Sequence, residues 1–541
     1  MLDARGRRGL SSGPASGADA GEGRGGGRWR RRASGRCDSA NSPSSARSAS
    51  SPYPDRFART HTLAEARALG ERLGLEVGAA PRDDAPQLRL CGRLMALRDM
   101  GRLGFARLQD HSGALQLVFE VRALGQEAYR RAVRLLDVGD HLGAQGRLFY
   151  TRKGELSLLV EQWQLLSKAL RPLPEKWHGL RDRELCWRQR YLDLLVNPET
   201  RERFRRRGEL VRALRAMLEE HGFVEVETPV LTPQPSGALA RPFVTHHHAL
   251  DLDVYLRIAP ETWLKRLIVG GYDRVYEFAR CFRNEGMDPS HLQDFTMLEW
   301  YAAWWNYLDN MEFTEQLVRH AVERVVGGTA VEIRGRRVEF GGRWERRTLR
   351  ELILQDSGID IDAHADAASL RAAIAARGID LEQSPEETAR LGRGSLIDRL
   401  YKVVSRPRID GPLFITAHPA DLSPLARRSD EDPARADRFQ LVVAGWEVVN
   451  AYSELIDPLD QRARLEQQAA ARAAGDAEAM VVEEDYLLAM EHGMPPVSGF
   501  GLGIDRFAAP AERRREPARR GLLPPHAPCA RGGGRAPRGH P

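Results

Sequence analysis

Residues 282–299 read FRNEGMDPSHLQDFTMLE, and residues 501–506, over two hundred positions further along the chain, read GLGIDR. In the first stretch Arg283 is followed by the acidic Glu285 and the aromatic Phe295. The second stretch ends in Arg506. A guanidinium stacks on a flat base and also binds phosphate oxygens, which an ammonium cannot do. Arg283 and Arg506 are therefore candidates for cations that draw charge away from a phosphate under attack.

In order and spacing, these stretches resemble motifs 2 and 3 of the class II aminoacyl-tRNA synthetases, in which motif 2 is two strands around a loop. The segment from Gly222-Phe223 to Pro229 resembles motif 1, whose proline-terminated strand builds the dimer interface of that family. The resemblance implies an α+β catalytic domain with an antiparallel sheet flanked by helices. It also implies a homodimer that uses ATP as a substrate and Mg²⁺ as its cofactor.

The resemblance assigns a role to each polar or aromatic side chain of the nucleotide site. In the family, the counterpart of Arg283 contacts the α-phosphate and the substrate carboxylate, and the counterpart of Arg506 stacks on adenine and meets the γ-phosphate. No protein general base is evident, so we expect catalysis to come from positioning and electrostatics. The expected ATP-binding residues are Arg283, Glu285, His291, Phe295 and Arg506, and the two arginines are also the expected catalytic residues.

Motifs 2 and 3 serve many substrates, so they do not indicate which amino acid the site takes. The carboxylates of the substrate pocket are the informative residues. Residues 257–261 (RIAPE), 299–301 (EWY) and 450–455 (NAYSEL) resemble the lysyl-tRNA synthetases of subclass IIb. A close contact between a carboxylate and an ammonium contributes up to about 4 kcal/mol at an effective dielectric constant of roughly 20, whereas a site for aspartate needs cations there. The resemblance assigns the ε-ammonium to Glu299, Tyr301 and Glu454, the α-amino group to Gly237 and Glu261, part of the carboxylate to Asn450, and the methylene chain to Tyr452.

Upstream of the motifs, short runs that alternate between apolar and polar residues predict the strands of a small barrel. Five such strands with a helix interposed are typical of an OB fold. The resemblance assigns anticodon contacts with tRNA(Lys) to this barrel, where stacking on a splayed base contributes roughly 1–3 kcal/mol per base. The strand-like runs are 88–94, 104–110, 114–119, 141–149 and 156–160. The positions that match anticodon contacts of the family are Arg98, Phe105, Gln116 and Glu155.

The chain has 541 residues, too many for one ordinary core. Its first 55 residues are rich in Gly, Ser, Ala and Arg and cannot bury enough apolar surface to fold, so we expect disorder there. Pro172-Leu173-Pro174 marks a linker. The expected division is a disordered extension at 1–55, the anticodon-binding barrel at 56–170, a linker at 171–200, the catalytic domain at 201–509 with a helical insertion near 350–400, and a low-complexity tail at 510–541.

Composition bears on partners and compartment. The formal net charge of +6 permits a polyanionic partner, but basic and acidic residues nearly balance. No stretch approaches the roughly 20 apolar residues that cross a bilayer, so we expect no membrane partner. The five cysteines lack the spacing of a disulfide framework or a zinc site, which favours a reducing, cytoplasmic compartment. The Arg/Ser-rich N-terminus leaves a transit peptide open as an alternative.

Two departures from the family pattern bear on activity. Relatives usually keep two carboxylates for magnesium before motif 3, whereas here Glu447 stands with Gln440 at the other position, so the number or affinity of metal ions is open. After Phe507 the chain continues with Ala508-Ala509-Pro510 and Arg/Gly/Pro-rich residues, where relatives form an apolar helix. A frameshifted C-terminus and an upstream-extended N-terminus would explain both ends. We expect the motif 3 helix to lose its packing, and this form of the chain to be poorly stable or weakly active.

The preferred hypothesis is a lysine–tRNA ligase, which activates L-lysine with ATP and transfers it to the 3′ end of tRNA(Lys). One alternative is a paralogue that lysylates a protein, although such paralogues typically lack the anticodon barrel. The other alternative is an inactive or regulatory RNA-binding relic, because the C-terminus departs from the family.

Overall fold

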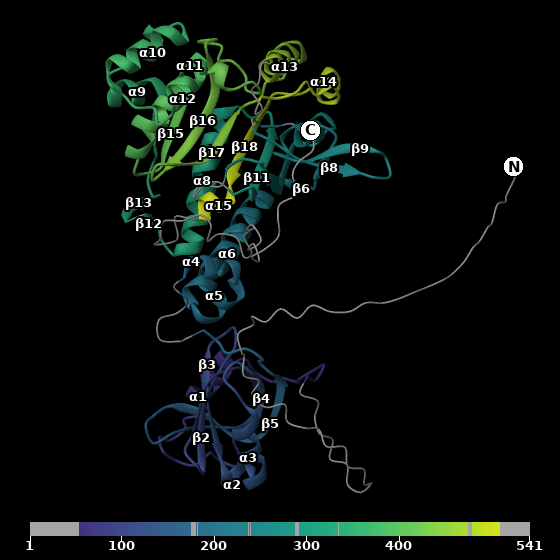
Figure 1. Ribbon diagram of the computed structural model, residues 1–541, viewed down its shortest axis with the longest axis vertical. Coiled ribbons are helices and arrows are strands. Elements are labelled where there is room, and N and C mark those ends of the chain that lie inside the picture. The colour runs from purple at the N-terminus through teal and green to yellow at the C-terminus, as the bar shows by residue number, and fades with distance from the viewer. Residues whose placement is uncertain are drawn as a thin grey trace, which may run out of the picture. The chain divides into compact units, whose positions relative to one another are not determined.

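The computed structural model describes residues 53–174, 180, 182–235, 237–238, 240–286, 292–333, 335–473 and 479–508 (Figure 1). The chain divides into two compact units, one ending at Pro172 and the other beginning at Leu173. The expectations for His291, for most of the N-terminal extension and for the tail from Ala509 onward lie outside the described residues. No helix in the described part of the chain is long and apolar enough to cross a membrane.

The first unit is a closed barrel with strand order β1-β2-β3-β5-β4. Leu115, Leu117 and Phe119 of β3 are buried, whereas Gln116 between them is partly exposed. Strands with one buried face can close into a barrel around an apolar interior. The OB fold expected from the sequence is confirmed. The strands are β1 (Leu88–Asp99), β2 (Leu103–Gln109), β3 (Ala114–Glu120), β4 (His141–Tyr150) and β5 (Leu156–Ser167), and the helices are α1 (Leu63–Arg72), α2 (Val121–Leu124) and α3 (Gln126–Leu135).

The second unit is built on an eight-stranded sheet with the order β14-β15-β16-β17-β18-β11-β10-β6. Its central pairs are antiparallel, as expected, but the pairs β14/β15 and β10/β6 are parallel, so the sheet is mixed. The strands are β6 (Val224–Glu225), β10 (Arg274–Phe282), β11 (Asp294–Ala303), β14 (Glu345–Thr348), β15 (Leu413–Pro419), β16 (Arg435–Val443), β17 (Trp446–Ser453) and β18 (Val497–Gly503).

This sheet brings together the two stretches that began the sequence argument. Strands β10 and β11 pair antiparallel from Arg274 opposite Ala302 to Phe282 opposite Asp294. Strand β18 pairs with the other edge of β11 and leads directly into the short helix α15 (Ile504–Ala508). Side chains from 282–299 and 501–506 therefore meet on one sheet.

Helices and two small sheets complete the second unit. Helices α4 (Arg183–Arg188) and α5 (Arg190–Val196) fall within the stretch expected to be a linker, and the Asp182 side chain caps α4 by accepting from the N–H of Leu185 at 3.1 Å. The other helices are α6 (Pro198–Glu220), α7 (Glu261–Val269), α8 (Tyr307–Val326), α9 (Leu349–Ser357), α10 (Ala367–Ala376), α11 (Pro385–Arg390), α12 (Arg393–Val404), α13 (Pro458–Ala473) and α14 (Glu484–Glu491), with 3-10 turns η1 (Ile361–Ala363), η2 (Arg406–Arg408) and η3 (Ala420–Leu422). The small sheets contain β7 (Leu231–Thr232), β8 (Phe243–His247) and β9 (Leu252–Leu256), and β12 (Ala330–Ile333) with β13 (Arg336–Glu339).

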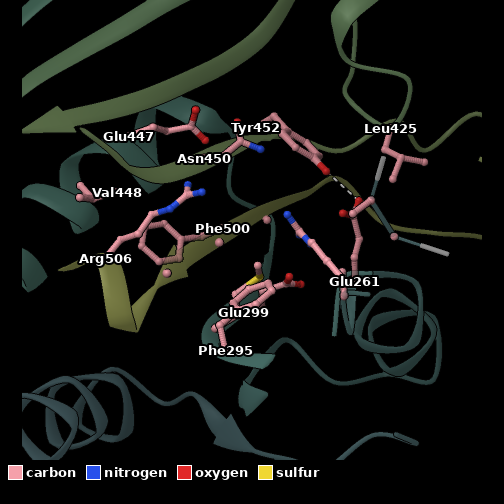
Figure 2. Close-up of a pocket in the computed structure, with 18 of the residues that line it drawn as sticks. Glu261, Phe295, Glu299, Leu425, Glu447, Val448, Asn450, Tyr452, Phe500 and Arg506 are labelled. Carbon is pink, nitrogen blue, oxygen red and sulfur yellow. Dashed lines mark hydrogen bonds between the residues drawn. The ribbon is translucent and has the colours of Figure 1, made fainter. Parts of the chain in front are cut away.

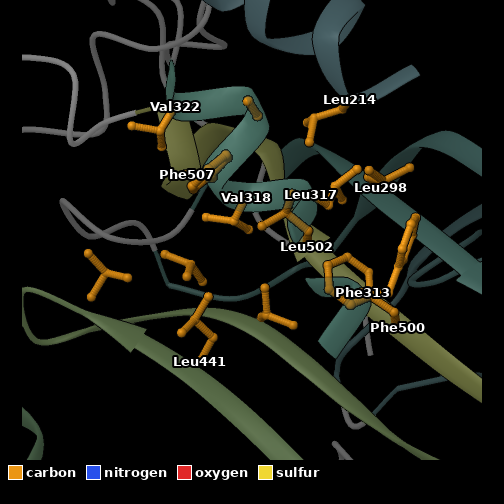
Figure 3. Packing of buried hydrophobic residues seen from close by; sticks show 14 of the residues in the cluster. Leu214, Leu298, Phe313, Leu317, Val318, Val322, Leu441, Phe500, Leu502 and Phe507 are labelled. Carbon is orange, nitrogen blue, oxygen red and sulfur yellow. The ribbon is translucent and has the colours of Figure 1, made fainter. Parts of the chain in front are cut away.

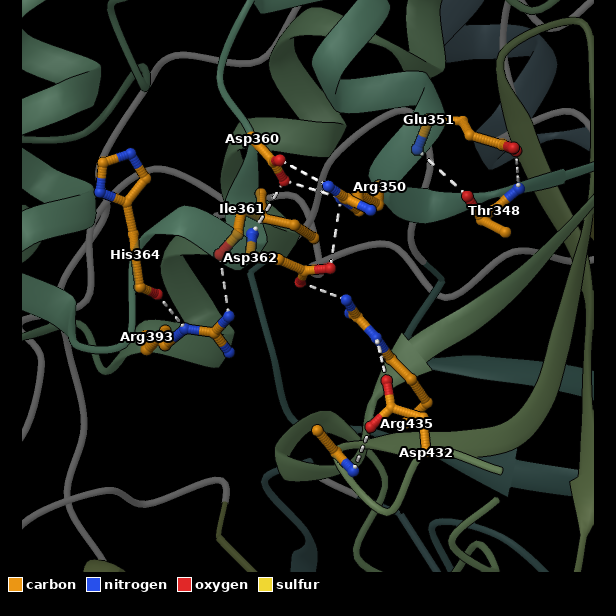
Figure 4. A network of polar contacts seen from close by, with 11 residues as sticks. Thr348, Arg350, Glu351, Asp360, Ile361, Asp362, His364, Arg393, Asp432 and Arg435 are labelled. Atoms are coloured by element: carbon orange, nitrogen blue, oxygen red, sulfur yellow. Dashed lines mark hydrogen bonds and ion pairs between the residues drawn. The ribbon is translucent and has the colours of Figure 1, made fainter. Parts of the chain in front are cut away.

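A polar network ties the helices after β14 to the sheet (Figure 4). Arg350 of α9 reaches Asp360 at 2.6 Å and Asp362 at 3.2 Å, and Arg435 of β16 also pairs with Asp362. Arg393 at the start of α12 donates to the carbonyl of His364 at 2.7 Å. These arginine side chains hold the turns between the helices that follow β14 in place against β16.

The main hydrophobic cluster lies between the sheet and helices α6 and α8 (Figure 3). The expectation that the motif 3 helix loses its packing is wrong for its described residues, because Ile504 and Phe507 are buried in this cluster. Phe507 lies beside Val322 of α8 in Figure 3. The buried residues of β18 continue into α15, so the helix is packed against the core before the chain reaches Pro510.

Candidate active site

One pocket of about 320 Å³ gathers most of the expected site residues (Figure 2). In Figure 2, Arg506 and Glu447 lie toward one end of the pocket and Glu261 lies toward the other. The expected residues that line it are Gly237, Glu261, Arg283, Glu285, Phe295, Glu299, Tyr301, Glu447, Asn450, Tyr452 and Arg506.

Arg283 is placed by the first residues after β10. Its N–H donates to the carbonyl of Gln293 at 2.8 Å, and the next N–H, of Asn284, donates to the carbonyl of Arg241 at 2.7 Å. Its guanidinium carbon lies 5.1 Å from the centre of the Phe295 ring. Its Nε is buried and meets no acceptor among the described residues. A buried guanidinium donor without a partner is costly, and a carboxylate or phosphate oxygen is the partner that suits it.

Arg506 is placed by its neighbour Asp505. The carboxylate of Asp505 accepts from Arg207 of α6 at 3.0 Å and from the backbone N–H of Thr296 at 2.8 Å. These contacts join α15, which carries Arg506, to α6 and to β11. Arg283 follows β10 and Arg506 follows β18, and these two strands flank β11 in the sheet.

The acidic end of the pocket is built from three elements. Glu261 is the first residue of α7, and its Oε1 accepts from the hydroxyl of Tyr452, on β17, at 2.7 Å. Glu299 and Tyr301 alternate on β11 and share a face, and the Tyr301 hydroxyl donates to Glu299 at 3.3 Å. Burial raises the pKa of Glu299 well above its ordinary value, the charge of Glu261 adds to the rise, and Arg283 opposes it. A bound ammonium would offset this cost.

Glu454 is the one expected lysine-binding residue that does not line the pocket, and its carboxylate lies against Gly499, which does line it. A Cβ at Gly499 would overlap Oε1 of Glu454 and the ring of Tyr301. Glu454 is 1% exposed and forms an ion pair with Lys265, which is also bonded to Glu261 at 2.6 Å. Glu454 is therefore a second layer directly behind the acidic end.

Three residues of this site were not anticipated from the sequence. Lys265 follows Glu261 by four positions, a helical spacing that pairs opposite charges and so was a usable signal. Gly499 begins the alternating run Gly-x-Gly-x-Gly at 499–503, which marks close approach of side chains to a strand. Arg438 had no local signal; it lines the pocket and donates to Asn450 Oδ1 at 2.8 Å, which orients that amide.

The residues expected to hold magnesium form a contact of their own. The Gln440 amide donates to Glu447 at 2.9 Å, and its oxygen lies 3.2 Å from Nε2 of His418. Burial, with the charge of Arg438, lowers the pKa of His418 to about 3, so its ring is neutral. The described residues contain no cluster of three His, Cys, Asp or Glu side chains that could hold a metal. They fit a Mg²⁺ ion that is held chiefly by substrate phosphates with one carboxylate, and do not fit a dedicated cage.

The residues expected to meet the anticodon lie on the outer face of the barrel. Arg98 of β1 is opposite Phe105 of β2, and Gln116 of β3 is opposite Ser157 of β5 and donates to its hydroxyl at 2.9 Å. Glu155 is exposed immediately before β5. These side chains come from neighbouring strands and point away from the apolar interior. Their part in binding tRNA stays a prediction.

Sequence comparisons agree with this fold and this pocket. The family described as tRNA synthetases class II (D, K and N) matches residues 182–512, and the family described as OB-fold nucleic acid binding domain matches residues 88–166. The chain therefore belongs to the class II tRNA synthetases of the D, K and N group.

Several relatives within that family are lysine–tRNA ligases. The chain is 45% identical to the lysine–tRNA ligase of Pelotomaculum thermopropionicum over 84% of this chain and 87% of that protein. It is 44% identical to that of Moorella thermoacetica, over 84% of this chain and 90% of that protein. It is 45% identical to that of Magnetococcus marinus, over 84% and 89%. The activity expected from the sequence, an ATP-dependent lysine–tRNA ligase, is confirmed.

Proposed function

We propose that the pocket binds lysine at its acidic end and ATP at its guanidinium end, so that lysyl-adenylate forms between them. The observation that carries this assignment is the presence, in one cavity, of buried carboxylates beside the unpartnered Nε of Arg283. Carboxylates suit the two ammonium groups of lysine, and the guanidinium suits the carboxylate and phosphate that react.

Different residues of the pocket bind the ε-ammonium, the α-ammonium and the methylene chain of lysine. Glu299 and Tyr301 bind the ε-ammonium, with the charge of Glu454 behind them. Glu261 and the backbone near Gly237 bind the α-ammonium, and the Tyr452 ring covers the methylene chain. A substrate shorter by one methylene loses only about 1–3 kcal/mol of binding, so ornithine is a weaker substrate and is not absolutely excluded.

Adenylate formation needs no protein base, because the lysine carboxylate is already ionised at neutral pH. A carboxylate oxygen attacks the α-phosphorus, the bond to the β-phosphate oxygen breaks, and pyrophosphate leaves. Arg283 holds the carboxylate and the α-phosphate in line and stabilises the charge that develops there. Phe295 and Arg506 enclose adenine, and Asn450, oriented by Arg438, helps to hold the carboxylate.

Glu447 is the residue that would hold a Mg²⁺ ion bound together with ATP. When bound, Mg²⁺ would screen the negative charge of the phosphates, with Glu447 as its protein ligand. The amide of Gln440 already bonds Glu447 and would orient that carboxylate.

In a second reaction the terminal hydroxyl of tRNA(Lys) attacks the adenylate carbonyl and AMP leaves. The outer barrel face carrying Arg98, Phe105 and Gln116 binds the anticodon, and two copies of the chain form a homodimer.

The test is ATP–pyrophosphate exchange by the purified full chain, measured with each of the standard amino acids and with ornithine. We expect exchange to depend on lysine, with weak exchange on ornithine. Transfer to tRNA(Lys), measured with radioactive lysine, distinguishes the tRNA ligase from a protein-lysylating enzyme. A folded chain that shows no lysine-dependent exchange would instead be a regulatory relic, and the proposal would fail.

A further inference from the structure

Lys265 is a buried cation at the acidic end of the pocket that the proposed chemistry does not use. Its side chain is 0% exposed, and its ammonium contacts two carboxylates, Glu261 at 2.6 Å and Glu454. The first of these carboxylates lines the pocket, and the second lies directly behind it. A buried lysine that pairs with two residues of a binding site controls the charge that the site presents.

The other groups around Lys265 do not compensate its charge. Three tyrosine rings from three elements surround the ammonium, with ring centres between 5.7 and 5.9 Å away. Their hydroxyls are neutral, because burial raises the pKa of each tyrosine. The groups that face Lys265 are Glu261 of α7, Glu454 after β17, Tyr301 of β11, Tyr452 of β17 and Tyr486 of α14.

The charges of the pocket match those of lysine only when Lys265 is counted. Glu261, Glu299 and Glu454 supply three negative charges, and Lys265 leaves two of them uncompensated. Lysine brings two ammonium groups to this end, and its carboxylate is met separately by Arg283. Without Lys265 the free pocket would hold one more uncompensated carboxylate in a buried place, and such a charge is removed by taking up a proton, which bound lysine must then expel.

We propose that Lys265 is a positioning and specificity residue that acts as the internal counter-ion of the lysine pocket and keeps Glu454 ionised for the substrate. This inference rests on the proposed function of the pocket. Burial raises the pKa of Glu454 well above its ordinary value and Glu261 adds to the rise, whereas the Lys265 ammonium, in direct contact with the carboxylate, is the largest influence that opposes it. Removing the ammonium therefore favours a protonated, neutral Glu454, which attracts the ε-ammonium of lysine less strongly.

The test compares the wild-type chain with Lys265→Met, a variant of similar length that lacks the charge. Calorimetric titration with lysine at pH 7, in buffers of different ionisation enthalpy, counts the protons released on binding. Glu299 is the one group expected to release a proton in the wild type, so we expect the variant to release about one proton more. In ATP–pyrophosphate exchange, we expect the KM for lysine to rise about tenfold at pH 7 and to fall as the pH is raised to 8.5, with the KM for ATP unchanged.

Two further variants separate charge from structure. Lys265→Arg keeps the charge and should release as few protons as the wild type, even if its KM is altered. Lys402→Met removes a partly exposed lysine of α12 that pairs with Asp398 at 2.6 Å and does not line the pocket, and it should behave as the wild type in every measurement. A thermal melt by circular dichroism establishes that each variant is folded.

Several results would overturn the inference. Equal proton release by Lys265→Met and the wild type would show that the ammonium does not hold Glu454 ionised. If Lys265→Met fails to fold, the proton release measured with the wild type tests the inference. Release of two protons per bound lysine at pH 7 would contradict an ionised Glu454. Release of one proton or fewer would support it. Absence of lysine-dependent exchange in the wild type would defeat the proposed function itself, which is a different outcome.

Discussion

At the scale of single residues, Glu299 connects burial to the pH dependence of substrate binding. Its pKa is raised by burial and by Glu261, so it binds a proton at a higher pH than an ordinary glutamate does. Lysine favours the ionised form, and binding must expel that proton. Because the protonated fraction grows as the pH falls, the affinity for lysine should weaken as the pH is lowered through the raised pKa.

This prediction is checked by the KM for lysine in pyrophosphate exchange between pH 5.5 and 8.5. In the wild type the KM should rise toward low pH, and in Glu299→Gln it should be higher and nearly independent of pH. The KM for ATP, measured alongside, should change little in either chain. A wild-type KM for lysine that is constant over this range would contradict the raised pKa.

At the scale of elements, the attachment of α15 to its neighbours decides how Arg506 is presented. Asp505 receives bonds from Arg207 of α6 and from the N–H of Thr296 on β11. Asp505→Ala should therefore loosen the helix and leave two partly buried donors without their acceptor, at a cost of about 1 kcal/mol in the free energy of unfolding. The measurement is urea unfolding together with the KM for ATP, which should rise more than the KM for lysine.

Asp505→Asn is the matched control for this prediction, because it keeps one acceptor and the shape of the side chain. It should retain more stability and a lower KM for ATP than the alanine variant. If alanine at this position leaves both the unfolding midpoint and the KM for ATP unchanged, the contacts of Asp505 do not position Arg506.

At the scale of the whole molecule, the barrel and the catalytic unit serve different reactions. Phe105 is a partly buried aromatic on the outer face of the barrel, paired across the ladder with Arg98. Loss of one stacked base costs roughly 1–3 kcal/mol, so Phe105→Ala should reduce kcat/KM for tRNA(Lys) about tenfold or more. Pyrophosphate exchange, which involves no anticodon, should be unchanged and is the internal control. An equal loss in both reactions would show that the barrel and the catalytic unit do not serve separate reactions.

The catalytic motifs could be predicted from the sequence because each is a local pattern. The hairpin around Arg283 and the strand and helix ending in Arg506 are single elements, and their adjacency follows from the pairing of β11 with β18. The packing of α15 was predicted wrongly. The composition of the residues after it predicts weak packing, whereas Ile504 and Phe507 are buried by contacts with the core.

By itself, the amino-acid sequence determined the class of fold, the nucleotide-binding arginines and the acidic character of the substrate end, since these depend on residue type and short spacing. Only the tertiary structure decided that Glu454 lies behind Gly499 and shares its charge with Lys265. These three residues come from β18, α7 and the end of β17, and they are far apart along the chain. The charge of a buried pocket depends on which groups folding brings within a few ångströms of one another, and no local pattern contains that information.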